Sequence, residues 1–322
     1  MITSPKTVCL DLTTPVPRPM APPAASVLCL GNFDGVHCAH AALPAAAASL
    51  AARLGNGTSP LPVGVFSFFR PSGDYFSPNT GTHLTTLRDK LSLLRNAGAS
   101  FACLCDFPSI RDLSPTALME LLVSTAGCRG VACGYNHRFG RGASGGVEDL
   151  AAYFGSDSVT VLPPMEMNGL PVSATRIRAA LTAGDTETAT RLLGRPYSLT
   201  ATVVAGKQLG RALGFPTANQ FFLPESLVPA HGVYAVRCHT PHGIFPAVAN
   251  VGRRPTVDAH GRVNCETHIL GYSHDLYGHR MQVDFLAYLR PERRFDSLDA
   301  LQEAIRRDAE AAEAYVHRNG WI

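Results

Sequence analysis

The sequence predicts an α/β fold followed by an all-β fold, in which a doubly wound parallel sheet precedes a small antiparallel β-barrel with a terminal helix. Three observations support this prediction. Short apolar runs alternate with helical patterns as far as Gly184. Strand-like runs separated by Gly, Pro and His turns follow, and helical periodicity returns only after Ser297. The chain of 322 residues is also long enough for two domains.

Strand and helix signals follow one another in the first part of the chain. Apolar runs predict strands at residues 26–30, 63–69, 101–107, 130–134 and 159–162. Helical patterns lie between them at 41–54, 86–97 and 114–124, and a further helix opens at Ser173. Strands that alternate with helices in this way favour a parallel sheet of the doubly wound type.

Strand-like runs dominate the second part of the chain. They lie at 199–204, 232–237, 247–251, 265–270 and 281–289, a spacing typical of a small antiparallel barrel. The final segment predicts a helix with one apolar face toward the barrel, formed by Leu298, Leu301, Ile305, Ala309, Ala312 and Val316. We place the two domains at 1–185 and 186–322.

Composition and charge limit the classes of function. Hydrophobic residues make up 46% of the chain and charged residues 16%, and no apolar span is long enough for a bilayer. The net charge of +3 forms no basic stripe, so we expect neither a nucleic-acid nor a membrane partner. The nine cysteines are odd in number and sit mostly in apolar runs, which predicts reduced thiols and a cytoplasmic location. We expect no signal peptide, and a loosely ordered proline-rich stretch at 15–23.

Residues 206–219 combine glycines, cations and a hydroxyl–amide pair. The glycines leave room for backbone N–H groups to approach phosphate, and the cations add positive charge beside them. The glycines and cations are Gly206, Lys207, Gly210, Arg211 and Gly214. Thr217 and Asn219 point the same way on an extended strand and can offer two oxygens to Mg²⁺. The pattern therefore indicates a nucleotide site, with an ordinary glycine-rich hairpin as the alternative.

A second phosphate-binding pattern follows the first predicted strand, where the sequence reads GNFDGVHCAH. Backbone amides at the opening of a helix favour phosphate. The residues that would present them are Gly31, Phe33, Asp34 and Gly35. His37 and His40 are three residues apart, so they share one helical face and can both hydrogen-bond phosphate oxygens. The alternative is a pair of solvent-facing turn histidines.

A third pattern opens the helix predicted at Ser173. Two hydroxyls and two guanidiniums gather there, and the helix dipole and bidentate donors favour a triphosphate. These residues are Ser173, Thr175, Arg176 and Arg178. An N-cap serine followed by surface arginines is the alternative.

The second half of the chain resembles the riboflavin kinase module of the bacterial bifunctional riboflavin kinase/FMN adenylyltransferase family. The resemblance is carried by GRPYSLTATVVAGKQLGRALGFPTANQ, AVANVGRRPTV, CETHIL and DLYGHRMQVDF. Upstream, GNFDGVHCAH, GYNHRFGRGASG and VSATRIRAAL resemble the same family's adenylyltransferase module in the same order. The resemblance implies a Rossmann-like nucleotidyltransferase module over 1–185 and a riboflavin kinase module over 186–322. Riboflavin, FMN and ATP are the implied substrates, and Mg²⁺ is the implied cofactor.

The resemblance also assigns roles to single residues. It implies that Glu266 accepts the proton of the alcohol substrate, whereas a salt-bridged strand glutamate is the alternative. It makes Asn136 a substrate-positioning residue, with a turn amide as the alternative. Asn250 and Arg290 lie in loops rich in cations that we expect to contact substrate.

The first half departs from the family pattern at several positions. Ala39 replaces a glycine, Pro44 falls within the expected helix, and 67–72 reads SFFRPS in place of a Pro-His-Pro cluster. The expected function is nevertheless phosphorylation of riboflavin to FMN and adenylylation of FMN to FAD. The alternatives are a monofunctional riboflavin kinase with a degraded first module, a non-catalytic flavin-binding regulator, and a nucleotidyltransferase acting on another small phosphate ester.

Overall fold

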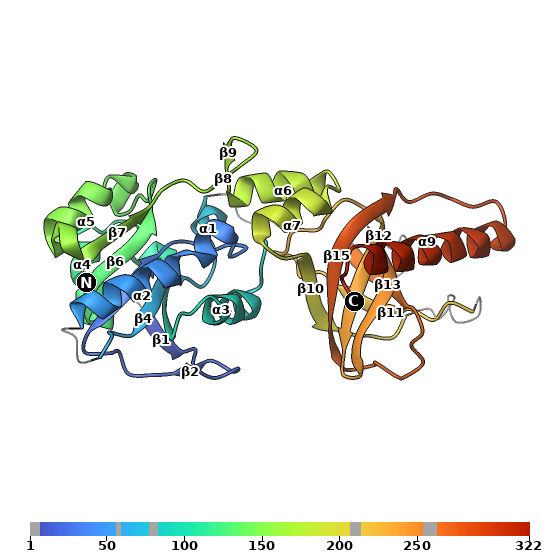
Figure 1. Cartoon of the computed structure of the whole chain (residues 1–322), viewed down its shortest axis with the longest axis horizontal. Coiled ribbons are helices and arrows are strands. Elements are labelled where there is room, and N and C mark those ends of the chain that lie inside the picture. The colour runs from blue at the N-terminus through green and yellow to red at the C-terminus, as the bar shows by residue number, and fades with distance from the viewer. Residues whose placement is uncertain (1–6, 56–58, 77–82, 207–213, 254–262) are drawn as a thin grey trace. The chain divides into compact units, whose positions relative to one another are not determined.

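A computed structural model describes residues 7–55, 59–76, 83–206, 214–253 and 263–322 of the chain (Figure 1). The chain divides into two compact units, 1–174 and 175–322. The division falls immediately before most of helix α6 (Ala174–Thr182), a little ahead of the expected boundary near residue 185.

The first unit is built on a seven-stranded sheet in the order β2-β1-β5-β4-β3-β6-β7. Its parallel strands are β3 (Ser26–Leu30), β4 (Val63–Phe68), β5 (Phe101–Cys105), β6 (Cys128–Gly134) and β7 (Val159–Leu162). Each coincides with an apolar run in the sequence. Strands β3 and β5 are buried at every residue, as parallel strands covered on both faces require.

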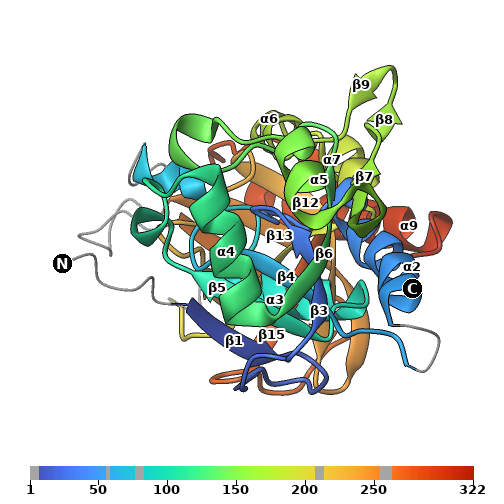
Figure 2. The same ribbon diagram turned by 90° about the vertical axis from the view of Figure 1, so that its left-hand side faces the viewer.

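Helices cover both faces of this sheet. Helices α2 (Leu43–Leu54) and α3 (Leu87–Asn96) pack on one face, and α4 (Pro115–Ala126) and α5 (Val147–Phe154) on the other. Figure 2 shows α2 and α4 on opposite sides of the strands. The predicted doubly wound sheet is therefore confirmed, although α5 was not predicted.

Short elements complete the unit: α1 (Cys38–Ala41), the hairpin β8 (Glu166–Met167) and β9 (Leu170–Pro171), and the 3-10 turns η1 (Ser72–Tyr75), η2 (Phe107–Ser109), η3 (Arg141–Ala143) and η4 (Ser156–Ser158).

The N-terminal region differs from the sequence-based expectation. Strand β1 (Thr7–Asp11) pairs antiparallel with β5, and β2 (Arg18–Pro19), inside the proline-rich stretch, pairs with β1. The expectation of loose order is thus wrong here, because long-range pairing supplies the hydrogen bonds. Register places Cys9 opposite Cys103, and the two form a disulfide. The expectation of reduced thiols is therefore wrong for this pair.

The second unit contains an antiparallel sheet in the order β10-β15-β12-β13-β14-β11. A bridge between Val204 and Asn219 links the two edge strands, so that the sheet forms a nearly closed barrel, as predicted. The strands are β10 (Tyr197–Thr202), β11 (Ala218–Phe221), β12 (Gly232–Thr240), β13 (Gly243–Arg253), β14 (Val263–Ile269) and β15 (Arg280–Arg290).

Helices of the second unit include one that the sequence pattern did not predict. Helix α7 (Thr186–Leu193) lies in the region expected to hold no helix before Ser297. Asp185 caps it by accepting the N–H of Thr188, and eight residues are too few for a clear periodic signal. Within the described ranges, no helix is long and apolar enough to cross a membrane.

Helix α9 (Leu298–Arg318) begins after the N-cap Ser297, as predicted, and packs on β12, β13 and β15. Ala312 and Val316 of the predicted apolar face are buried, but Leu298 is 60% exposed. Figure 1 shows the reason, since the first turn of α9 projects past the strands.

A buried carboxylate ties the barrel strands to the end of the chain. Asp284 of β15 is 2% exposed. Its partners are Ser198 Oγ at 2.7 Å, Gln282 Nε2 at 2.7 Å, Arg237 Nε at 2.8 Å and His239 Nε2 at 2.8 Å. Burial would raise the pKa of Asp284, but these four partners outweigh it and hold the pKa at about 2. Arg237 also donates to the carbonyl of Trp321 at 2.9 Å and lies 5.0 Å from its ring centroid.

This network predicts a pH-dependent stability. The folded pKa of Asp284 lies below the value of about 3.9 in an unfolded chain, so the carboxylate stabilises the fold above about pH 4, and this is lost as the pH falls toward 2. We predict that Asp284→Asn lowers the free energy of unfolding by about 2–3 kcal/mol at pH 7 and by much less at pH 2.

The measurement is urea unfolding followed by tryptophan fluorescence. Trp321 is the only tryptophan, so the signal reports the second unit. Equal losses of stability at pH 7 and pH 2 would contradict the prediction, because they would assign the effect to packing and not to the charge.

Candidate active sites

The strand order of the first unit reverses beside β3. The chain moves outward through β3, β4 and β5 and then returns to place β6 on the other side of β3. At such a reversal the carboxyl ends of parallel strands leave a crevice in which ligands bind. The motif 31–40 follows β3, and the motif 134–140 follows β6. The fold therefore brings both sequence motifs to one edge of the sheet.

His37 and His40 lie together at the start of α1. Their rings stack with centroids 3.7 Å apart. His37 Nδ1 accepts the backbone N–H of His40 at 3.3 Å, so a neutral His37 carries its proton on Nε2 and can donate it. Burial, with smaller effects from His37 and the Lys90 cation, holds the pKa of His40 well below its usual range. His40 is therefore a neutral imidazole at pH 7, stacked on the ring of His37.

The turn before these histidines has an unusual backbone. It contains all four residues predicted to face phosphate, namely Gly31, Phe33, Asp34 and Gly35. Phe33 has φ 52° and Val36 has φ 40°, although side chains disfavour positive φ. The fully buried ring of Phe33 and a bond from the Leu84 N–H to Asp34 Oδ1, 2.9 Å long, hold the turn in place.

A buried ammonium group lies beneath this turn. Lys90 of α3 is 4% exposed, and its Nζ donates to the Phe68 carbonyl at 2.7 Å, to Ser67 Oγ at 3.3 Å and to the Asn32 carbonyl at 3.5 Å. Burial lowers the pKa of Lys90 to about 8, and the charge of Asp34 opposes this shift. Sequence reasoning did not single out Lys90, because a lysine in an amphipathic helix usually faces water.

The helix predicted over 41–54 is interrupted just before Pro44. Helix α1 ends at Ala41 and α2 begins at Leu43, so Pro44 occupies the first turn of a new helix. A proline N at that position would have no helical partner in any case. The chain thus accommodates Pro44 by a break between two helices.

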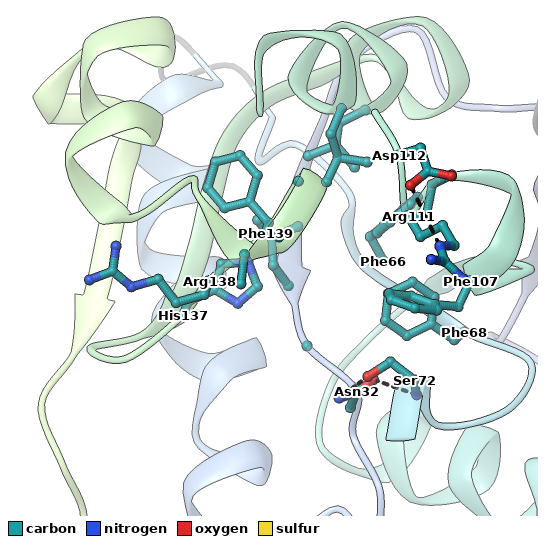
Figure 3. Close-up of a pocket in the computed structure, with 18 of the residues that line it drawn as sticks. Asn32, Phe66, Phe68, Ser72, Phe107, Arg111, Asp112, His137, Arg138 and Phe139 are labelled. Atoms are coloured by element: carbon teal, nitrogen blue, oxygen red, sulfur yellow. Dashed lines mark hydrogen bonds and ion pairs between the residues drawn. The ribbon is translucent and has the colours of Figure 1, made fainter. Parts of the chain in front are cut away.

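A cavity of about 470 Å³ opens beside the turn, and we call it the aromatic cavity (Figure 3). Figure 3 shows His137 and Phe139 on one side and the rings of Phe66, Phe68 and Phe107 on the other. Asn32 Nδ2 donates to Ser72 Oγ at 3.0 Å at its edge. Burial lowers the pKa of His137 to about 4, so this ring is neutral at pH 7. Aromatic walls with few polar groups suit a planar ring system.

The remaining residues predicted for the first site are Asn136, beside the aromatic cavity in the sequence, and Ser173, Thr175, Arg176 and Arg178, close to the boundary between the two units. Asn136 lies in the exposed turn after β6, next to the cavity residue His137. Ser173 lies in the first unit, one residue before its end, whereas Thr175, Arg176 and Arg178 lie in the first two turns of α6 and belong to the second unit.

Two cavities lie on the barrel, and Thr217 lines both. The helix-side cavity, of about 290 Å³, is bordered by α9 and contains Glu266, Asn250 and Arg290. The loop-side cavity, of about 510 Å³, contains Gly206, Asn219 and the loop 272–277. Thr217 thus stands where the two cavities meet.

The barrel register brings the predicted metal and catalytic residues together. Asn219 on β11 lies directly opposite Glu266 on β14. Asn264 Nδ2 donates to Glu266 Oε1 at 3.0 Å and to Asn219 Oδ1 at 3.1 Å. Asn219 Nδ2 donates to the Thr217 carbonyl at 3.3 Å. Sequence reasoning missed Asn264, because one asparagine in a strand carries no motif.

The glycine-rich segment is described only in part. A Cβ at Gly206 would lie 2.5 Å from Asn219 Nδ2, so glycine is needed for this close approach. Gly214 has φ 85°, which also favours glycine. Lys207, Gly210 and Arg211 lie outside the described residues.

Asn250 and Arg290 form the wall of the helix-side cavity. Asn250 pairs with Glu266 across β13 and β14, and its Nδ2 donates to Glu292 Oε1 at 3.0 Å. The guanidinium of Arg290 engages Asp308 of α9, with Nε 3.0 Å from Oδ1 and Nη2 2.6 Å from Oδ2. Arg290 therefore fastens α9 to the barrel beside the cavity.

The fold and the sites define a two-domain transferase that uses nucleotides. Residues 20–176 match the FAD synthetase family, and residues 193–316 match the riboflavin kinase family. A bifunctional riboflavin kinase/FMN adenylyltransferase of Pseudomonas fluorescens is 36% identical over 292 residues, 89% of this chain and 92% of its own length. One from Escherichia coli K12 is 36% identical over 303 residues, 92% of this chain and 94% of its own. The chain belongs to the bifunctional riboflavin kinase/FMN adenylyltransferase family.

A solved structure shares the overall fold. A protein of Streptococcus pneumoniae described as a macrolide-efflux protein has a TM-score of 0.81 and 30% identity, covering 91% of this chain and 95% of its own. That description concerns the other protein. The two family matches and the enzyme relatives give the family of this chain.

The close approach at Gly206 gives a testable prediction. Gly206→Ala would push its Cβ into the Asn219 amide and displace it, so we expect Mg-ADP to bind the barrel at least about tenfold more weakly, a cost of about 1.4 kcal/mol. Isothermal titration calorimetry would measure this. Gly73→Ala is the control, because a Cβ there meets nothing within 4 Å. Unchanged affinity in Gly206→Ala would show that Asn219 takes no part in nucleotide binding.

Proposed function

We propose that the chain phosphorylates riboflavin to FMN with ATP and then adenylylates FMN to FAD with release of pyrophosphate. The modules 1–185 and 186–322 carry the second and first of these steps, respectively. The observation that carries the kinase step is the position of Thr217, which lines both barrel cavities, with Glu266 in one and Asn219 in the other.

In the kinase step, riboflavin occupies the helix-side cavity and ATP the loop-side cavity. The apolar side chains of the helix-side cavity, among them Val233, Phe295 and Leu301, suit a flavin ring. Glu266 accepts the proton of the riboflavin primary alcohol while the alcohol oxygen attacks the γ-phosphorus of ATP. The bond from the γ-phosphorus to the bridging oxygen breaks, and ADP leaves.

The residues around Thr217 suit Mg²⁺ as the cofactor. Asn219 Oδ1 accepts one bond from Asn264, and an amide oxygen can accept two. Mg²⁺ usually takes only one or two protein ligands and fills its other positions with water and substrate phosphates. Thr217 and Asn219 would hold the ion, which when bound neutralises charge on the transferred phosphate.

In the adenylyl step, FMN occupies the aromatic cavity. Its phosphate oxygen attacks the α-phosphorus of ATP, and the bond to the β-phosphate oxygen breaks to release pyrophosphate. Such an in-line displacement needs positioning and stabilisation of developing charge. His37 donates from Nε2. The Gly31 N–H donates to the Phe66 carbonyl at 3.4 Å and the Gly35 N–H to Thr85 Oγ1 at 3.2 Å, so these two amides hold the turn and do not face phosphate as predicted. Asn136, Ser173, Thr175, Arg176 and Arg178 are proposed to bind nucleotide or flavin.

A monofunctional riboflavin kinase is the second candidate, favoured by Ala39 and the missing Pro-His-Pro cluster. The stacked histidine pair and the aromatic cavity support the bifunctional proposal. We also propose that the enzyme works in the cytoplasm. The buried free thiols Cys29, Cys105, Cys128, Cys133, Cys238 and Cys265 suit a reducing compartment, and the Cys9–Cys103 disulfide is the exception among the described cysteines.

The kinase proposal predicts the effect of Glu266→Gln. The amide keeps the volume but cannot accept the hydroxyl proton, so FMN formation should fall by about 10²–10⁴-fold. Purified full-length chain would be incubated with riboflavin, ATP and Mg²⁺, and the flavins separated by chromatography. Near-normal turnover would assign Glu266 a structural role, and adenylylation of added FMN by the same sample is the control for folding.

The adenylyl proposal predicts the effect of replacing both histidines. His37→Ala combined with His40→Ala should eliminate FAD formation from FMN and ATP, because both phosphate-binding imidazoles disappear. Riboflavin phosphorylation by the same protein should persist. If the wild-type chain makes FMN but no FAD after prolonged incubation, the monofunctional alternative holds instead.

A further inference from the structure

Asn264 occupies an unusual position between two residues of the kinase site. It lies on β14 two residues before Glu266, so both side chains project from the same face of the strand. Strand β11 places Asn219 opposite Glu266 and therefore diagonal to Asn264. Asn264 is 2% exposed. Its only way to act on substrate is through its neighbours.

One amide nitrogen of Asn264 serves two acceptors. It donates to Glu266 Oε1 at 3.0 Å and to Asn219 Oδ1 at 3.1 Å, which uses both of its hydrogens. Reversing the amide would turn its oxygen toward two other oxygens. The two acceptors therefore fix the orientation of Asn264.

The oxygen of Asn264 shows that this orientation is costly. Asn264 Oδ1 is buried and has no hydrogen-bond partner in the described part of the chain. Leaving a buried acceptor unpaired is unfavourable, and such a group in a folded protein needs an explanation. Donation to both Glu266 and Asn219 provides one.

We propose that Asn264 is a positioning residue of the kinase site, whose single amide orients the proton acceptor Glu266 and the metal ligand Asn219 together. By donating to Oε1, it fixes the orientation of the Glu266 carboxylate on β14. By donating to Oδ1, it turns the oxygen of Asn219 into the site and directs Asn219 Nδ2 to the Thr217 carbonyl. This inference rests on the proposed kinase function.

Other charged groups line the cavity that contains Glu266. Strand β11 contributes only Asn219 at this position, and β13 contributes the uncharged Asn250. The charged and titratable groups that line the same cavity are His268 on β14, Arg290 at the end of β15, Glu292 and Arg293 in the following loop, and Asp308 on α9. None of these is changed in the variants below, so differences between variants and wild type report Asn264.

The test compares Asn264→Asp with wild type in the full chain. The new carboxylate has the same size but presents oxygen to both acceptors and adds negative charge beside Glu266. We expect kcat for FMN formation at pH 7 to fall by roughly 10- to 100-fold, as is common when the group that orients a metal ligand is lost. The pH below which activity disappears should also rise, because the added charge favours protonated Glu266. Activity should recover in part at higher pH.

Asn264→Ser is the second variant, because its smaller side chain keeps one donor and adds no charge. It should lose less activity than Asn264→Asp and show a smaller shift of the pH profile. This ordering keeps the test decisive if Asn264→Asp folds poorly, which the fluorescence of Trp321 would reveal.

Gln220→Met is the matched control. Gln220 is a buried amide on the same barrel, one residue from Asn219 and on the opposite face of β11, and it donates to the carbonyls of Ala201 and Met281. The variant Gln220→Met should lower the stability of the barrel without moving the pH profile of FMN formation. An unchanged profile in both Asn264 variants, or the same shift in Gln220→Met, would overturn the inference. A wild-type chain that makes no FMN would instead remove the kinase function and this inference with it.

Discussion

The first candidate site depends on one buried charge. The ammonium group of Lys90 joins the end of β4, through the Phe68 carbonyl, to the turn after β3, through the Asn32 carbonyl. A buried ammonium is stable only when oxygens surround it, so the turn and the strand end must stay at fixed separation. The stacked imidazoles, the aromatic cavity and the strained turn are all arranged on these two strand ends. Replacing this charge would remove the constraint that aligns them.

In the barrel, the strand register aligns the polar side chains of the candidate site. Asn219 on β11 lies opposite Glu266, and Glu266 lies opposite Asn250 on its other side. Side chains on neighbouring antiparallel strands are held a fixed distance apart by the backbone ladder. A helix, α9, closes the apolar side of the cavity, and the Arg290–Asp308 ion pair fastens it. The two units thus align their candidate site residues with unrelated geometry.

Sequence reasoning predicted the parts of the fold that have local signals. The buried parallel strands and the barrel strands are apolar runs bounded by turns, and Ser297 is a clear N-cap. Strand β1 was not predicted because its partner β5 lies far along the chain: Cys9 and Cys103, which lie opposite each other, are 94 residues apart. The sequence TVCLD carries no local signal of that pairing. The motifs located His37, Thr217 and Glu266, but they did not reveal Lys90 or Asn264. The role of such residues becomes visible only when folding buries them beside their polar partners.

The backbone of the turn after β3 has a consequence for how this enzyme can change. Phe33 and Val36 sit at positive φ, a conformation that costs of order 1–3 kcal/mol for each such residue. A glycine at either position would relieve that cost, but it would also delete a side chain that is buried in the core. Losing a buried phenylalanine costs about 3–5 kcal/mol, which is more than the relieved strain returns. The core therefore keeps the turn in its disfavoured conformation, and substitutions that raise the stability of this protein should be sought away from it.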